Sequence, residues 1–165
     1  NRDPKLARKL GFRYVKLPTL FKNSDIVTLH VPENKHTRHM INKDTLKQFK
    51  EGSILINTSR GGLIDTYALV KALMSGKVGY AGLDVLEDEC FIKEEKELLN
   101  PDFIKTCNLE VILQDNMLIK NPNVYVTPHN AFNSREALLR IVETTMDNIK
   151  AFLRKKPINE VDTDV

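Results

Sequence analysis

The stretch SILINTSRGGLIDTYAL, residues 53–69, decides the fold. It opens on continuous apolar residues, 54–56, of the kind found in a parallel strand that helices cover on both faces. Asp65 is well placed to cap a helix over residues 66–75. We therefore expect a buried strand, a turn that carries Arg60, and a helix.

Two glycines, Gly61 and Gly62, follow this arginine, and they permit backbone conformations closed to other residues. In open parallel sheets, ligands bind at the carboxyl ends of the strands, so Arg60 lies where a substrate-binding group is expected. Its planar guanidinium suits a carboxylate because it can donate two parallel hydrogen bonds. An arginine paired with a surface acid is the alternative that this segment alone leaves open.

Length and composition predict one hydrophobic core, either alone or with an appended segment, because 41% of the 165 residues are hydrophobic. The net charge of +3 comes from 25 basic and 22 acidic residues that are interspersed, which weighs against a nucleic-acid partner. No apolar stretch is long enough for a transmembrane helix, and residues 1–10 lack the apolar part of a signal peptide. We therefore expect no membrane partner and a cytoplasmic location. Cys90 and Cys107 form neither a CxxC pair nor a disulfide framework, so reduced thiols are expected.

Strand and helix patterns alternate with short connections, which predicts an α/β fold with a parallel, doubly wound sheet. Between residues 86 and 123 the pattern loosens, and we expect a long excursion with one or two short helices. Ser134 is expected to cap the longest helix, whose buried face is predicted from helical spacing to be Leu138, Ile141, Val142, Thr145, Ile149 and Phe152. The expected strands are residues 12–15, 26–29, 54–56, 78–85 and 124–126, and the other expected helices are residues 1–10, 17–23, 43–49 and 66–75.

Ionisable groups follow three of these strands: Arg60 the third, Asp84 and Glu89 the fourth, and His129 the fifth. Parallel strands place such groups along one edge of the sheet. A histidine beside a carboxylate is a proton donor with a raised pKa, and a neighbouring arginine can hold an anionic substrate. Taken singly, His129 is more readily interpreted as a structural histidine and Glu89 as a solvated loop acid, but their joint occurrence at strand ends favours a functional role.

Three motifs, INTSRGGLID (56–65), GLDVLEDE (82–89) and NVYVTPHNAF (123–132), resemble the C-terminal signatures of the D-isomer-specific 2-hydroxyacid dehydrogenases. The resemblance covers nearly the whole chain and places Arg60, Glu89 and His129 on the family's catalytic positions. Glu89 and His129 are 40 residues apart, a long separation that resembles the D-lactate and D-2-hydroxyisocaproate branch.

The resemblance implies NAD as cofactor and a fold of the Rossmann type. His30, Val31 and Pro32 match the loop that lines the adenine side of the cofactor. Thr58 and Ser59, together with Arg60, match the turn near the nicotinamide, and Asp84 matches the acid that contacts the carboxamide region. The implied cofactor-binding residues are therefore His30, Val31, Pro32, Thr58, Ser59 and Asp84.

The implied reaction transfers a hydride from C4 of NADH to C2 of a small 2-keto acid and gives a D-2-hydroxy acid, with pyruvate and D-lactate as the expected pair. Arg60 would hold the substrate carboxylate and polarise the carbonyl. His129, protonated and held by Glu89, would donate the proton that completes the hydroxyl group.

Two family features are absent from the sequence: the G-x-G-x-x-G turn that binds the pyrophosphate, and the acid that holds the ribose. Asp3 does not replace that acid, because it lies at the start of a helix, beyond the expected ribose position. We therefore expect the chain to be a piece of a larger enzyme and to be inactive alone. The full-length enzyme is expected to be a homodimer. Residues 1–130 would be the C-terminal portion of an NAD-binding domain lacking its first strands, and residues 131–165 a long helix returning to an absent substrate domain.

Two alternatives stay open. A non-catalytic, dinucleotide-sensing interaction protein resembling the family's transcriptional corepressors would keep the fold and a similar triad, although those proteins belong to the branch with the shorter segment. His30, His36 and His39 would form a metal site in the second alternative. No carboxylate or cysteine completes a familiar ligand spacing there, and Pro32 interrupts the segment, so no metal is expected.

Overall fold

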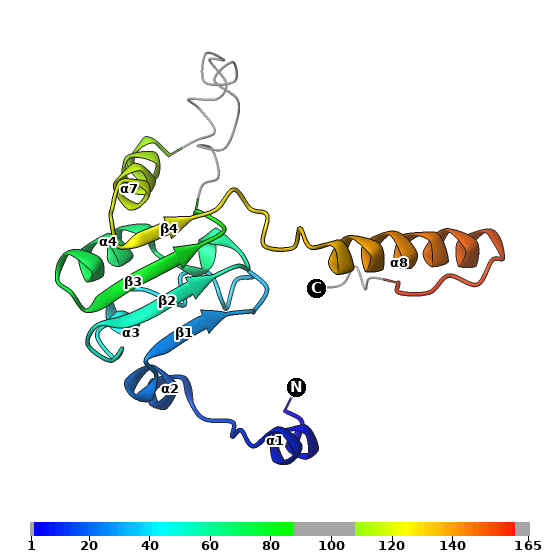
Figure 1. Ribbon diagram of the computed structural model, residues 1–165, viewed down its shortest axis with the longest axis horizontal. Coiled ribbons are helices and arrows are strands. Elements are labelled where there is room, and N and C mark those ends of the chain that lie inside the picture. Colours follow the sequence, from blue (N-terminus) through cyan, green and yellow to red (C-terminus); the bar gives the residue numbers. More distant parts are fainter. Residues whose placement is uncertain (1, 88–107, 161–165) are drawn as a thin grey trace. The chain divides into compact units, whose positions relative to one another are not determined.

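The computed structural model of the protein describes residues 2–87 and 108–160 (Figure 1). The chain divides into two compact units, Asn1–Pro128 and His129–Val165. The first unit contains a four-stranded parallel sheet in the order β1-β2-β3-β4. Its strands are β1 (Ile26–Leu29), β2 (Ser53–Asn57), β3 (Val78–Leu83) and β4 (Val124–Val126). The predicted α/β fold with a parallel sheet is confirmed.

The core forms around β2, which pairs with a neighbour on each side. Leu55 is fully buried and lies in register with Val27 of β1 and Ala81 of β3. The helix after β2, α4 (Thr66–Met74), packs against α3 (Lys43–Leu46), α7 (Leu109–Ile119) and β3. The continuous apolar run in the sequence is therefore a strand buried by pairing and by helix packing.

Local capping explains where several helices begin. The Asp65 carboxylate accepts a hydrogen bond from the Ala68 N–H at 2.9 Å, as predicted for the start of α4. Asp3 caps α1 (Pro4–Leu10) in the same way, and α2 (Leu17–Asn23) begins with a proline in its first turn. These helices agree with the sequence-based expectation.

Residues 12–15 do not form the predicted strand. The Phe12 and Tyr14 rings instead pack edge to face at 5.3 Å, and the Tyr14 hydroxyl accepts a hydrogen bond from the Asp3 N–H at 2.9 Å. This segment therefore holds the start of α1 rather than joining the sheet. Two helices differ in length from the prediction. The helix α3 ends at Leu46 rather than at residue 49, and the described part of residues 86–123 contains the eleven-residue α7 where short helices were expected.

The second unit contains the long helix α8 (Arg135–Leu153), capped by the Ser134 hydroxyl as predicted. Its predicted apolar face is present but not buried, because none of the residues of α8 is buried. The prediction of a helix is confirmed, and the prediction that this face is buried is wrong within the described residues. Helical spacing sets the position of such a face, but a partner surface is needed to cover it.

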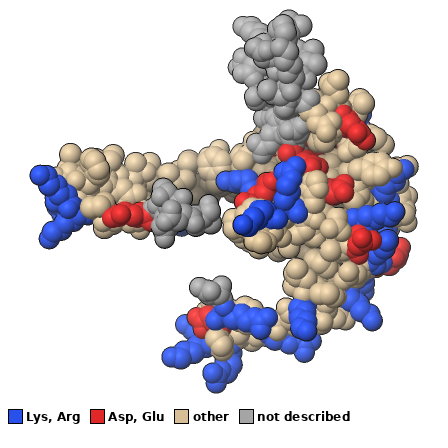
Figure 2. All heavy atoms as spheres, turned by 180° about the vertical axis from the view of Figure 1, so that it is seen from behind, with Lys and Arg blue, Asp and Glu red and all other residues tan. Residues whose placement is uncertain are grey.

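Basic and acidic side chains are interspersed on the face of the first unit that Figure 2 shows, as in the sequence. None of the helices formed by the described residues has the length and apolar character needed to cross a membrane. The predicted site residue Glu89 and both cysteines, Cys90 and Cys107, lie outside the described residues.

Candidate functional site

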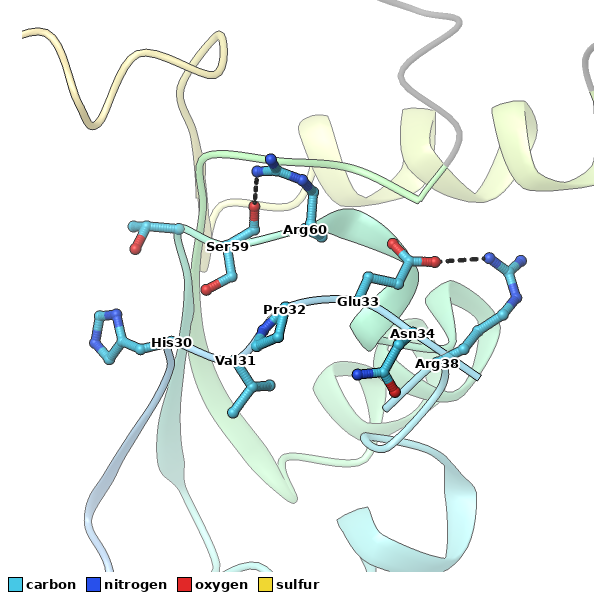
Figure 3. Close-up of a pocket in the computed structure, with 9 residues that line it drawn as sticks. His30, Val31, Pro32, Glu33, Asn34, Arg38, Ser59 and Arg60 are labelled. Atoms are coloured by element: carbon cyan, nitrogen blue, oxygen red, sulfur yellow. Dashed lines mark hydrogen bonds and ion pairs between the residues drawn. The ribbon is translucent and has the colours of Figure 1, made fainter. Parts of the chain in front are cut away.

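A cavity of about 690 Å³ opens where β1 and β2 end (Figure 3). It is lined by residues that follow two adjacent parallel strands, which is where open α/β sheets bind ligands. The lining residues are His30, Val31, Pro32, Glu33, Asn34 and Arg38 after β1, and Thr58, Ser59 and Arg60 after β2. The structure therefore brings together six of the nine predicted site residues, and Arg60 is among them.

Hydrogen bonds from a buried asparagine fix the turn after β2. The side chain of Asn57 accepts from the Ser59 N–H at 3.0 Å and donates to the Arg60 carbonyl oxygen at 2.8 Å. The Ser59 hydroxyl donates to the carbonyl oxygen of Leu29, the last residue of β1, at 2.8 Å. The two strand ends are thus tied together, and the backbone that carries Arg60 is held at the edge of the sheet.

Arg60 presents its side chain at the cavity and is exposed. Its Nη1 donates to the carbonyl oxygen of Ser59 at 2.7 Å (Figure 3). Among the described residues, no carboxylate forms an ion pair with Arg60, whereas Arg38 in the same cavity is paired with Glu33 at 2.9 Å. No acid among the described residues neutralises the guanidinium of Arg60, and its binding of an anionic ligand stays a prediction.

The glycines after Arg60 are required for a different reason than the predicted one. Neither Gly61 nor Gly62 has a positive φ angle. A Cβ on Gly61 would lie 2.6 Å from the Glu87 backbone nitrogen and closer still to the Leu86 carbonyl oxygen, and a Cβ on Gly62 would lie 2.7 Å from Oε2 of Glu33. The left-handed conformation that glycine permits is not used at either position; the glycines allow the close approach of two neighbouring segments.

Glu87, which sequence analysis did not single out, is a nearly buried carboxylate behind this turn, with a side chain only 10% exposed. Oε2 accepts from the N–H and the hydroxyl of Thr66, and Oε1 lies 2.5 Å from Nε2 of His39. Burial raises the pKa of Glu87, but the hydrogen bonds from Thr66 and His39 outweigh it, so its pKa lies below its usual value. The carboxylate is therefore ionised near neutral pH.

Asp84, predicted to contact the cofactor, is 3% exposed and does not line the cavity. It accepts a hydrogen bond from the Thr127 hydroxyl at 2.5 Å, and its N–H donates to the Asn57 carbonyl oxygen at 2.9 Å. Asp84 thus connects the ends of β2, β3 and β4. Its contact with a cofactor stays a prediction.

The predicted catalytic triad is not tested by the described residues. Glu89 lies outside them, and His129 belongs to the second unit, where it is half-buried with a φ of 51°. The histidines of the alternative metal site have other neighbours: His30 lies 2.9 Å from the Thr28 hydroxyl, and His39 contacts Glu87. In the part of the chain that the structure describes, no three histidine, cysteine or acidic side chains are grouped as metal ligands.

Four residues at or behind the cavity were missed by sequence reasoning: Glu33, Asn34, Arg38 and Glu87. The first three belong to the polar loop after Pro32, whose composition is that of an ordinary surface loop. Glu87 is two residues before Glu89 in the motif GLDVLEDE, and the run of three acids from Glu87 to Glu89 was the signal available.

Comparison with known proteins shows which family the chain resembles in sequence. Residues 1–131 match the family described as "D-isomer specific 2-hydroxyacid dehydrogenase, NAD binding domain". A "D-specific alpha-keto acid dehydrogenase" of Enterococcus faecium is 43% identical over 91% of this chain and 44% of its own length. A "Glyoxylate reductase" of Thermococcus litoralis is 39% identical over 99% of this chain and 43% of its own length.

Solved structures with a similar fold come from the same group of enzymes. The D-lactate dehydrogenase of Aquifex aeolicus, in a complex with NAD and lactic acid, superposes with a TM-score of 0.78 at 36% identity, over 94% of this chain and 45% of that one. The chain thus spans less than half the length of these relatives. By its sequence and its fold, the chain belongs to the D-isomer-specific 2-hydroxyacid dehydrogenase family, and residues 1–131 match the NAD-binding domain of that family.

Proposed function

We propose that this chain is part of an enzyme that reduces a small 2-keto acid with NADH to a D-2-hydroxy acid, with pyruvate and D-lactate as substrate and product. The observation that carries the proposal is Arg60, whose guanidinium has no carboxylate partner among the described residues. It lies at a cavity lined by the loop after β1 and the turn after β2. An arginine in this position suits an anionic substrate beside a cofactor.

The cavity residues fit a dinucleotide. A volume of about 690 Å³ is in the range of small-molecule sites, roughly 300–1,000 Å³. Val31 and Pro32 offer an apolar wall of the kind an adenine ring packs against, and Thr58 and Ser59 offer hydroxyl groups on the side of Arg60. When bound, NADH supplies the hydride that the reduction needs.

The residues of the chain would supply the other parts of the reaction. Arg60 binds the substrate carboxylate through two hydrogen bonds and, from the same side, polarises the keto oxygen as it gains negative charge. His129 would donate a proton to that oxygen, and Glu89 would hold the histidine ring in place for this transfer. Glu89 and His129 keep these roles as predictions from their motifs.

The choice of substrate rests on three similarities. The Enterococcus relative is named for alpha-keto acids, and the Aquifex structure contains lactic acid. The 40-residue separation of Glu89 and His129 in this sequence also resembles the D-lactate branch. Because a glyoxylate reductase is similarly close in sequence, glyoxylate is the competing substrate that an experiment has to include. No observation supports the corepressor alternative.

The direct experiment measures NADH oxidation by the full-length protein with pyruvate, glyoxylate and hydroxypyruvate at matched concentrations. We expect the highest kcat/KM with pyruvate and a product that only a D-specific lactate assay detects. A higher kcat/KM with glyoxylate would correct the substrate but retain the reaction. No oxidation with any of the three keto acids would contradict the proposed function.

A further inference from the structure

Five residues form a polar network on both sides of the turn that carries Arg60. They are Glu33, Arg38, His39, Thr66 and Glu87, and we call them the Glu87 clamp. Glu87 is central, because its two carboxylate oxygens contact different segments: Oε1 contacts His39, and Oε2 accepts a hydrogen bond from Thr66.

On one side, Glu87 holds the start of α4. Its Oε2 accepts from the Thr66 N–H at 3.1 Å and from the Thr66 hydroxyl at 2.8 Å. Thr66 is the first residue of this nine-residue helix, so the carboxylate also interacts favourably with the positive end of the helix dipole. The helix follows the turn directly, and the turn is thereby fixed at its downstream end.

On the other side, Glu87 holds the loop after β1. Its Oε1 lies 2.5 Å from Nε2 of His39 and 3.6 Å from Nη2 of Arg38. His39 has a φ of 50°, a left-handed conformation that is unusual for a residue other than glycine, and its N–H donates to the Gly62 carbonyl oxygen at 2.8 Å. One residue in a strained conformation therefore binds both the clamp carboxylate and the turn.

The turn between these two attachments is closely enclosed. The backbone at Leu86 and Glu87 fills the space where Gly61 would carry a Cβ, and the carboxylate of Glu33 fills the same space at Gly62. Glu33 is in turn paired with Arg38 at 2.9 Å. A displacement of Glu87 therefore has to be followed by the backbone next to Arg60.

We propose that Glu87 is a positioning residue that fixes Arg60 against the cavity by joining the segment after β3 to α4 and to His39. The proposal rests on the proposed function only in naming the keto-acid carboxylate as the ligand of Arg60. It assigns to Glu87 no contact with substrate or cofactor. Its effect is the placement of the guanidinium, and small displacements of a binding group are costly, with about 100-fold lost for roughly 1 Å.

The test compares Glu87→Ala with Asp65→Ala in the full-length protein. Asp65 caps the same helix through Ala68 but does not belong to the clamp, so its loss weakens α4 without freeing the turn. Amide hydrogen exchange reports the turn without any need for activity. We expect faster exchange of residues 58–64 in Glu87→Ala, and in Asp65→Ala faster exchange only in the first turn of α4.

Steady-state kinetics give the second readout. We expect the KM for pyruvate to rise on the order of tenfold in Glu87→Ala. The KM for NADH should change much less, and Asp65→Ala should keep both constants. A merely structural role would lower the concentration of active enzyme and leave the KM for pyruvate unchanged. Glu87→Gln still offers an acceptor to Thr66, so its KM for pyruvate should lie between those of the wild type and Glu87→Ala.

His39→Asn tests the clamp from its exposed side in case Glu87→Ala does not fold, since asparagine tolerates a positive φ but is too short to reach Glu87. It should reproduce the faster exchange of residues 58–64. Exchange of this turn at the wild-type rate in the folded variants, or an unchanged KM for pyruvate, would overturn the proposal. Absence of keto-acid reduction by the wild-type protein would instead contradict the proposed function, and the exchange experiment would still decide on the clamp.

Discussion

Gly61→Ala tests how tightly the turn beside Arg60 is packed. The added Cβ would overlap the Leu86 carbonyl oxygen and would also lie 2.6 Å from the Glu87 backbone nitrogen, where ordinary contacts begin near 3.4 Å. The two segments therefore have to separate by more than the distance of about 0.8 Å that the nitrogen alone requires. The obstacle is backbone on both sides, and no side-chain rotation removes it. We expect a loss of stability of about 1–3 kcal/mol, the usual cost of overpacking. We also expect kcat/KM for pyruvate to fall about 10- to 100-fold, because Arg60 moves with the turn.

The matched control is Gly82→Ala, the same substitution in β3. There the new Cβ would lie 3.9 Å from Cγ1 of Ile56, an ordinary contact. Urea unfolding and the kinetics of pyruvate reduction should both distinguish the two variants, with Gly82→Ala close to the wild type. If Gly61→Ala unfolds at the wild-type urea concentration and keeps the wild-type kcat/KM, the packing argument is refuted.

Two further predictions concern ionisable groups. Glu89→Gln in the full-length enzyme should lower the kcat for pyruvate reduction, because the carboxylate that would orient His129 for proton donation is lost, while the KM for NADH changes little; an unchanged kcat would show that Glu89 is not the partner of the histidine. The pKa of Glu87 lies below its usual value of 4.5, so its carboxylate stabilises the folded state above that pH, and this contribution is lost as the pH falls through the lowered value. Thermal unfolding should therefore show Glu87→Gln less stable than the wild type at pH 7 and approaching it below pH 4.5, and an equal difference at both pH values would contradict this reasoning.

The parts of the fold that follow local rules could be predicted from the sequence. The strand before Arg60, the helix capped by Asp65 and the helix capped by Ser134 all depend on short-range patterns of apolar residues and capping groups. Residues 12–15 carry the same β-type pattern, yet their aromatic rings pack on each other and the Tyr14 hydroxyl accepts a hydrogen bond from the N–H of Asp3, the cap of α1. A sequence pattern does not reveal which of two partners a short extended segment will have.

The site residues also include some that could be predicted from the sequence and some that could not. Six residues that follow β1 and β2 could be predicted, Arg60 from its place after a parallel strand and the other five from the resemblance to the family. Glu87 could not, since its importance arises from contacts with His39 and Thr66, which are distant in the sequence. The two glycines were recognised for the wrong reason, because φ angles and close approaches of neighbouring segments cannot be told apart from the residue type alone.

Arg60→Lys in the full-length enzyme tests most directly the central claim that Arg60 binds the substrate carboxylate. The substitution keeps the positive charge and removes the planar pair of donors, so one charge-assisted hydrogen bond is lost. Such a bond contributes about 1.5–3 kcal/mol, which corresponds to a rise of about 10- to 150-fold in the KM for pyruvate. Arg8→Lys, the same change on the exposed side of α1, is the control and should leave the KM unchanged. A KM for pyruvate in Arg60→Lys equal to that of the wild type would show that Arg60 is not the carboxylate-binding residue.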